Sequence, residues 1–169
     1  AYWSSFGQLV ILLLIQVGGL GVVTMAVAIT VGMGQHVSLM QRSTMQDAIS
    51  AQQIGGIVRM LRFVLKLTAG TELLGTCLLW PHFARDYGWL QGIWMAIFHS
   101  VSAFCNAGFD LMSSRGGGSL MAYAGDPLVN LTIMGLIVAG GLGFLTWADF
   151  SVNRLHWRKW TFQTRIILL

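Results

Sequence analysis

The residues best suited to chemistry lie between two long apolar segments, in the stretch from Phe98 to Asp110. Residues 89–104 predict an apolar helix of about four turns, after which residues 105–109 look like extended backbone containing a glycine. Non-helical backbone at membrane depth is tolerated only where protein buries it or where it lines a watery cavity. A short helix that leads into such a segment can direct backbone carbonyls at a desolvated cation. We therefore expect carbonyl ligation here.

The composition predicts an integral membrane protein. Apolar residues make up 55% of the chain and charged residues 9%, against about a quarter charged in soluble domains. Residues 1–41 and 127–148 carry no charge, and each run exceeds the roughly 20 residues that cross a bilayer. The first run has no basic start and is too long for a signal peptide. Since the chain lacks an initiator Met and stops as another apolar segment begins, we expect a fragment of a larger protein.

Three membrane spans are predicted, at residues 6–31, 57–80 and 128–148. Pro81 is expected to close the second span, and Asp126 and Pro127 are a strong helix start, as N-cap and first helical residue. Residues 38–50, within a polar loop, favour a short interfacial helix.

The distribution of Lys and Arg predicts the orientation. Basic residues gather in the loop before the second span and in the tail after Asp149, whereas the long stretch between the second and third spans carries only Arg85 and Arg115. Both basic loops are therefore expected in the cytoplasm, with the 89–110 stretch re-entering from outside. This topology accounts for the positive charge without a nucleic-acid partner.

Several polar residues within apolar segments have more than one interpretation. Arg59, Arg62 and Lys66 share one helical face and either anchor the helix at the interface or contact the pore entrance or a partner subunit. Glu72 is either a functional carboxylate or a packing residue that hydrogen-bonds a neighbouring helix. His99 is better explained as a packed or hydrogen-bonded residue than as a ligand. No residues have a spacing that indicates catalysis, and two cysteines cannot form a zinc site or a disulfide framework.

An internal repeat links the first and third spans. Residues 18–26 (GGLGVVTMA) recur as residues 140–148 (GGLGFLTWA), with six of nine positions identical. A basic loop follows each copy and contains a Ser/Thr–Arg pair, Ser38 with Arg42 and Thr161 with Arg165. The two spans are therefore predicted to be equivalent closing helices of successive modules.

The string SAFCNAGF at residues 102–109, together with the two GGLG helices and the SLMQR loop, resembles the Trk/Ktr/HKT superfamily of potassium and sodium transporters, most closely the Ktr/Trk-type membrane subunit. The resemblance implies four modules around one pore. It makes Gly108 the filter glycine and residues 105–109 the filter segment (Cys105, Asn106, Ala107, Gly108 and Phe109), with K⁺ held by the backbone of Asn106, Ala107 and Gly108. Asn106 could instead support the filter through hydrogen bonds.

The implied fold is all-α and integral to the membrane. Residues 1–33 would be the closing helix of module one, 34–56 a cytoplasmic loop, 57–150 module two, and 151–169 a cytoplasmic linker. Module two would contain spans at about 57–80 and 127–149 and a re-entrant pore helix and filter at 89–110. Asp110, where potassium channels have a second filter glycine, either concentrates cations at the outer mouth or has a cap or loop role.

The resemblance further implies a multi-pass plasma-membrane protein that conducts K⁺, as a homodimer bound to a cytoplasmic nucleotide-binding regulatory ring. No cofactor is expected beyond the transported K⁺ or Na⁺. Three alternatives stay open: a Na⁺ or mixed K⁺/Na⁺ transporter of the same superfamily, a non-conducting membrane scaffold, and a membrane enzyme that uses Glu72, His99 and Asp110.

Overall fold

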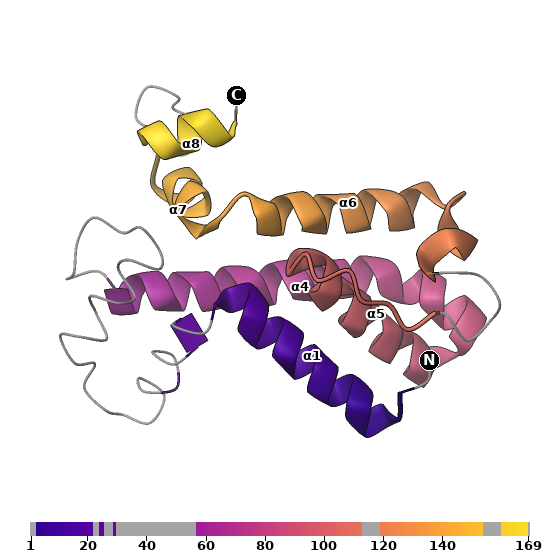
Figure 1. Cartoon of the computed structure of the whole chain (residues 1–169). Coiled ribbons are helices and arrows are strands. Elements are labelled where there is room, and N and C mark those ends of the chain that lie inside the picture. The colour runs from indigo at the N-terminus through magenta and orange to yellow at the C-terminus, as the bar shows by residue number, and fades with distance from the viewer. Residues whose placement is uncertain are drawn as a thin grey trace. The chain divides into compact units, whose positions relative to one another are not determined.

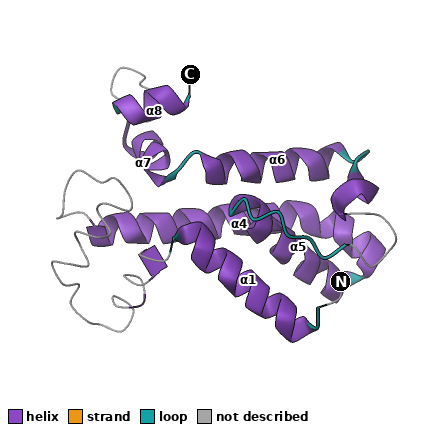
Figure 2. Cartoon of the chain, viewed as in Figure 1, coloured by secondary structure: helices purple, strands orange, loops and turns teal. Residues whose placement is uncertain are grey.

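The computed structural model describes residues 3–21, 24–25, 29, 57–112, 119–153 and 160–168. Within these ranges every regular element is helical and no strand occurs (Figure 2), as the composition predicted. The elements are α1 (Ser5–Leu20), α4 (Ile57–Tyr87), α5 (Trp89–Phe104), the 3₁₀ helix η3 (Ser119–Tyr123), α6 (Pro127–Gly141), α7 (Phe144–Asn153) and α8 (Phe162–Ile167). The predicted interfacial helix at residues 38–50 lies outside the described residues.

The chain divides into two compact units, one formed by residues 1–20 and 68–141 and the other by residues 21–67 and 142–169. In the first unit α5 packs against both α6 and α1 (Figure 1). Its core joins Leu79 and Phe83 of α4 to Met95 and Phe98 of α5 and to Val129 of α6. The central position of α5 places its C-terminal end among three other helices.

Helix α4 is longer than the sequence predicted. It runs to Tyr87 and contains Pro81, so the expectation that Pro81 closes the span is wrong. Proline cannot donate to the carbonyl four residues earlier, but membrane helices tolerate it where neighbouring groups satisfy the freed backbone. Near the start of α4, Arg59, Arg62 and Lys66 are all exposed, which confirms that the three cations share a face.

Helix α6 begins where the sequence predicted and ends earlier. Asp126 Oδ1 accepts hydrogen bonds from the amides of Leu128 (3.0 Å) and Val129 (3.2 Å), which confirms the N-cap. The helix ends at Gly141 and α7 begins at Phe144, so a continuous helix over residues 128–148 is wrong. The break is at the last glycine of the GGLG motif.

By length and apolar composition, residues 59–87 form one helix able to cross a bilayer, and residues 127–153 supply a second if α6 and α7 are counted as one broken span. Helix α1 is apolar but shorter. These counts cover only the part of the chain that the structure describes.

The second unit contains a polar contact between α7 and α8. Asp149 of α7 accepts hydrogen bonds from the amide of Thr161 (2.9 Å), from its hydroxyl (2.7 Å) and from the hydroxyl of Thr164. Thr161 is the N-cap of α8. The carboxylate of Asp149 therefore fixes the start of α8 to α7.

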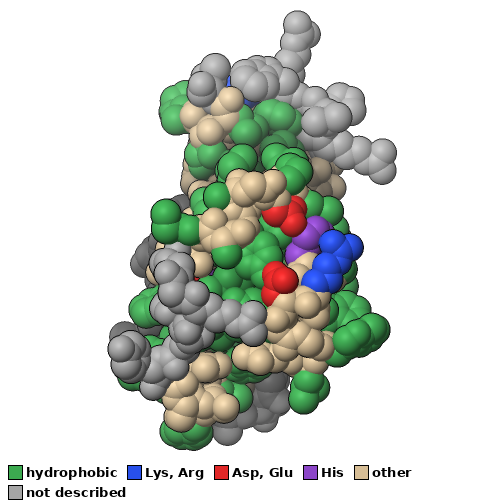
Figure 3. Space-filling view, turned by 90° about the vertical axis from the view of Figure 1, so that its right-hand side faces the viewer, with side chains coloured by type: hydrophobic (Ala, Val, Ile, Leu, Met, Phe, Trp, Pro, Cys, Tyr) green, Lys and Arg blue, Asp and Glu red, His purple; other side chains and the backbone are tan. Residues whose placement is uncertain are grey.

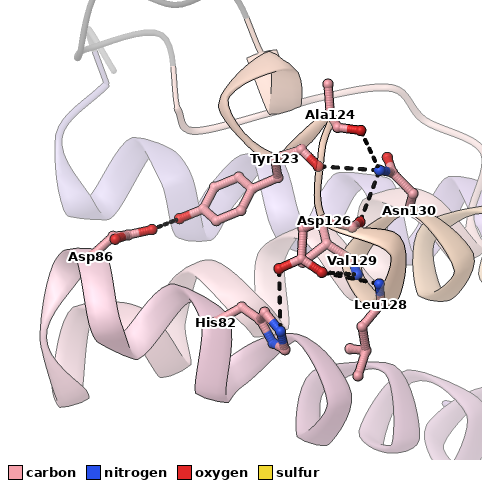
Figure 4. A network of polar contacts seen from close by, with 8 residues as sticks. All are labelled: His82, Asp86, Tyr123, Ala124, Asp126, Leu128, Val129 and Asn130. Carbon is pink, nitrogen blue, oxygen red and sulfur yellow. Dashed lines mark hydrogen bonds and ion pairs between the residues drawn. The ribbon is translucent and has the colours of Figure 1, made fainter.

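A polar network joins the C-terminal part of α4 to η3 and to the start of α6 (Figure 4). Tyr123 donates to Asp86, and His82 Nε2 lies 3.2 Å from Asp126 Oδ2. The amide of Asn130 donates to the carbonyls of Tyr123, Ala124 and Asp126. Figure 3 shows acidic, basic and histidine side chains gathered together on a face that otherwise carries many apolar groups. This network ties the segment that follows the candidate filter to α4.

Candidate functional site

The candidate site begins where α5 ends. The predicted helix over residues 89–104 is observed with those bounds. Beyond it, the amides of Cys105, Asn106 and Ala107 still donate to carbonyls of α5, at 2.9, 3.1 and 2.9 Å. Asn106 (φ 53°) and Gly108 (φ 72°) then adopt left-handed backbone, which Asn tolerates better than most residues and Gly adopts without strain. These two residues turn the chain out of the helix.

After this turn the chain runs back along α5. Figure 2 shows it as a loop beside the helix, and two side chains of α5 hold it there. The hydroxyl of Ser102 donates to the carbonyl of Phe109 at 2.7 Å, and the amide of Leu111 donates to His99 Nε2 at 3.5 Å. The pairing of 102 with 109 and of 99 with 111 shows that helix and loop run in opposite directions.

The carbonyls of the loop fall into two kinds. Among the described residues, none donates a hydrogen bond to the carbonyl oxygens of residues 105–108. The carbonyl of Phe109, by contrast, is engaged by Ser102. Four consecutive carbonyls are thus without a donor from the described chain, and the fifth residue of the predicted filter segment differs from them. Such carbonyls are suited to replacing the hydration shell of a cation.

The side chain of Asn106 points to α6. Its amide nitrogen lies 3.4 Å from the carbonyl of Ile137 and 3.5 Å from that of Phe104. Contacts of this kind are expected if Asn106 supports the loop through hydrogen bonds, which stays a prediction. Asp110 Oδ1 accepts from the amide of Met112 at 2.8 Å, a contact that matches the loop interpretation of Asp110.

Two glycines from the repeated motif flank the end of α5. A Cβ at Gly19 of α1 would lie 2.6 Å from Cys105 Cβ and closer still to its Sγ. A Cβ at Gly140 of α6 would lie 2.8 Å from the Phe104 carbonyl carbon and closer still to its oxygen. Any side chain at either position would displace the backbone that leads into the loop. The repeat was found from sequence, but its contact with the candidate filter was not.

The two copies of the motif share a backbone feature as well. Helix α1 ends just before Gly21 (φ 82°), and α6 ends shortly before Gly143 (φ 77°). These glycines are equivalent in the repeat, and each accepts a hydrogen bond four residues on, from Met25 (3.1 Å) and from Trp147 (3.4 Å). The two copies thus share a left-handed glycine at the equivalent position, and the correspondence of the two helices stays a prediction.

Glu72 lies among helices rather than in the loop. Gln16 of α1 donates to Glu72 Oε2 at 3.2 Å, and Ser100 of α5 donates to the Glu72 backbone carbonyl at 2.7 Å. The hydrogen bond to a neighbouring helix is the one expected of a packing residue. His99 belongs to a different set of hydrogen bonds, with Met95 and Leu111. Glu72 is thus separate from His99, whereas His99 and Asp110 line one cavity, so the structure does not bring all three residues together.

A cavity of about 200 Å³ adjoins the loop. His99, Ser102 and Asp110 contribute polar atoms to its lining, and Ile133 and Ile137 of α6 contribute apolar ones. Among the described residues no group of three or more His, Cys, Asp or Glu side chains could hold a metal ion.

Comparison with known proteins identifies the family. The family model described as TrkH, cation transport protein, matches residues 2–167. The chain is 37% identical over 166 residues to Ktr system potassium uptake protein B of Bacillus subtilis (strain 168), covering 98% of this chain and 36% of the relative. It is 34% identical over 168 residues to potassium/sodium uptake protein NtpJ of Enterococcus hirae, covering 99% of this chain and 36% of the relative. The chain thus spans about a third of the length of these relatives. It belongs to the TrkH family of cation transport proteins.

Proposed function

We propose that this chain supplies one filter segment of a cation pore that takes up K⁺. The carbonyls of Cys105, Asn106, Ala107 and Gly108 coordinate the dehydrated ion. Helix α5 is the re-entrant pore helix, with the negative end of its dipole toward the ion. Helix α1 closes the preceding module and α6 closes this one. Since the chain covers about a third of its relatives, transport by the whole protein is part of the proposal.

The observation that carries the proposal is the run of four carbonyls at residues 105–108 to which no described residue donates a hydrogen bond. At membrane depth a backbone carbonyl without a partner is costly, and because Asn106 and Gly108 are exposed, their carbonyls are open to a cation or to water. Gly108 permits this geometry because its φ of 72° would strain most residues with a side chain. We do not assign ion ligation to Phe109, because its carbonyl already accepts from Ser102.

K⁺ is the ion we favour, because relatives are named potassium uptake proteins. The Enterococcus relative is named a potassium/sodium uptake protein, so a mixed K⁺/Na⁺ pore is the second candidate. A non-conducting scaffold is the third candidate. It is disfavoured because it does not explain four consecutive carbonyls to which no described residue donates a hydrogen bond.

The proposal extends to orientation and partners. The protein crosses the plasma membrane several times, with both basic loops in the cytoplasm, and lipid surrounds its apolar helices. Exposed cations at the start of α4 support this orientation, because Lys and Arg concentrate on the cytoplasmic side. The relatives' name refers to a Ktr system. We propose that the whole protein is a homodimer that works with a cytoplasmic nucleotide-binding ring.

Rb⁺ uptake by the complete protein, together with its regulatory subunit, tests the proposal in cells without their own K⁺ uptake systems. The variant is Gly108→Ser and the matched control is Gly125→Ser, since Gly125 has ordinary φ and open space around it. A strain of ~1–2 kcal/mol at a left-handed residue predicts roughly a tenfold loss of uptake or of Rb⁺ over Na⁺ preference for Gly108→Ser. Unchanged uptake in Gly108→Ser would show that the filter is misassigned. No Rb⁺ uptake by the wild-type complex would favour the scaffold.

A further inference from the structure

One residue of α5 contacts both sides of the candidate filter glycine. The backbone carbonyl of Ser102 accepts from the amide of Ala107 at 2.9 Å, and its hydroxyl donates to the carbonyl of Phe109 at 2.7 Å. Gly108 lies between these two bonds. Ser102 is 3% exposed, so most of its surface is shielded although it lines the cavity beside the loop. The residue therefore fixes the two ends of a three-residue segment to a rigid helix.

His99 extends this contact one turn along α5. Its Nδ1 faces the carbonyl of Met95 at 2.7 Å, and its Nε2 faces the amide of Leu111 at 3.5 Å. The first partner can only accept and the second can only donate, so the imidazole is neutral with its proton on Nδ1. The side chain is 2% exposed and its ring lies 5.5 Å from that of Phe83. This packing fixes the orientation of the ring.

We propose that Ser102 and His99 are positioning residues that set the ion specificity of the filter, an inference that rests on the proposed function of residues 105–108. Neither side chain touches the ion. Ser102 turns the carbonyl of Phe109 toward α5 and so determines where the carbonyl of Gly108 points. His99 holds the returning chain beyond it. Without these bonds the loop loses a fixed spacing of carbonyls and accepts ions of more than one radius.

The alternative is that these bonds only stabilise the fold. The chain offers a matched control in Ser100, which lies on the same helix and is as buried as Ser102. Its hydroxyl donates at 2.7 Å to the backbone carbonyl of Glu72 on α4 instead of to the loop. Ser100→Ala and Ser102→Ala thus each remove one buried hydrogen bond of the same length, and only Ser102→Ala frees the loop.

The experiment compares wild type, Ser102→Ala, Ser100→Ala and Gly108→Ser in the complete protein with its regulatory subunit. Rb⁺ and Na⁺ uptake are each divided by the amount of protein in the membrane. We expect Ser102→Ala to lower the Rb⁺ over Na⁺ preference several-fold, and Ser100→Ala to keep the wild-type preference even if less protein accumulates. If Ser102→Ala does not accumulate, Ser102→Cys, which keeps the volume and weakens the donor, replaces it. His99→Leu, which can hydrogen-bond to neither partner, should also lower the preference.

Two results would overturn the inference. One is a wild-type preference in Ser102→Ala or Ser102→Cys, and the other is an equal loss of preference in Ser100→Ala. In either case a changed preference in Gly108→Ser would leave the proposed filter intact. Failure of the wild-type complex to take up Rb⁺ would instead contradict the proposed function itself.

Discussion

The two copies of the GGLG motif meet the end of α5 in different ways. In α1 the second glycine, Gly19, faces the side chain of Cys105, whereas in α6 the first glycine, Gly140, faces the backbone of Phe104. The neighbouring glycines, Gly18 and Gly141, have nothing within 4 Å. The repeat therefore preserves a close approach to the loop, but the position that provides it differs by one residue between the copies. A shared motif does not imply shared contacts.

The largest effect is expected for Gly140→Ala. Its Cβ would overlap the carbonyl group of Phe104, and no rotamer change can move a backbone atom. We expect the free energy of unfolding to fall by about 3 kcal/mol, the upper end of the range for overpacked cores. Rb⁺ uptake should be strongly reduced, and the unfolding midpoint in detergent should be lower. Gly141→Ala is the control and should be neutral or stabilising by ~0.5–1 kcal/mol, as for an unconstrained helix glycine. Equal midpoints for both variants would contradict the assigned contact.

Gly19→Ala should be the next most damaging change. Its Cβ would meet the Sγ and Cβ of Cys105. The Sγ can rotate away but the Cβ moves only with the backbone, and because this overlap is less severe than at Gly140, we expect a cost of about 2 kcal/mol. Cys105→Gly removes both overlapping atoms, so the double variant should recover part of the unfolding midpoint lost by Gly19→Ala. For Gly140 no side-chain substitution offers such a rescue. Additive effects of Gly19→Ala and Cys105→Gly would show that the two positions do not touch.

Sequence predicted the parts of this site that depend on nearby residues. The bounds of α5 and the cap at Asp126 follow from local apolar pattern and side-chain chemistry. The ends of the other helices were less well predicted: α4 continues through Pro81, and α6 stops at Gly141. A proline or a glycine within an apolar run does not by itself predict where a helix ends, because tertiary packing decides whether the helix continues.

The contacts of Ser102 could not be predicted from the sequence, because they depend on the path of the loop. Ser102 and Phe109 meet only because Asn106 and Gly108 both take left-handed backbone. The glycine was recognisable, but the asparagine was not, and the path of the loop depends on both. The repeat gave a usable signal for Gly19 and Gly140, since two glycine pairs at equivalent positions indicate close approach, although it could not identify what they approach. The module boundaries remain predictions.

Substitution of the last glycine of each motif should lower stability less than at Gly140 or Gly19, and by a similar amount in the two copies. Gly21 and Gly143 have nearly equal φ values, 82° and 77°. Alanine at either position should cost ~1–2 kcal/mol through backbone strain, and asparagine should cost less because it tolerates this conformation. The unfolding midpoints in detergent of the alanine and asparagine variants at both glycines measure these costs. A cost at only one of the two glycines would show that the helix breaks are not equivalent.

The smallest effect concerns a feature that only the second copy has. Nine residues after its first glycine comes Asp149, where the first copy has Val27. Asp149→Asn weakens the acceptor for Thr161 and Thr164 and should cost about 1 kcal/mol. The loss should appear as faster hydrogen exchange in α8, because the cap at Thr161 depends on this carboxylate. Val152→Ala, at a side chain that is 80% exposed on the same helix, is the control. Unchanged exchange in α8 would mean that the carboxylate does not hold the helix, and that the copies differ here in sequence only.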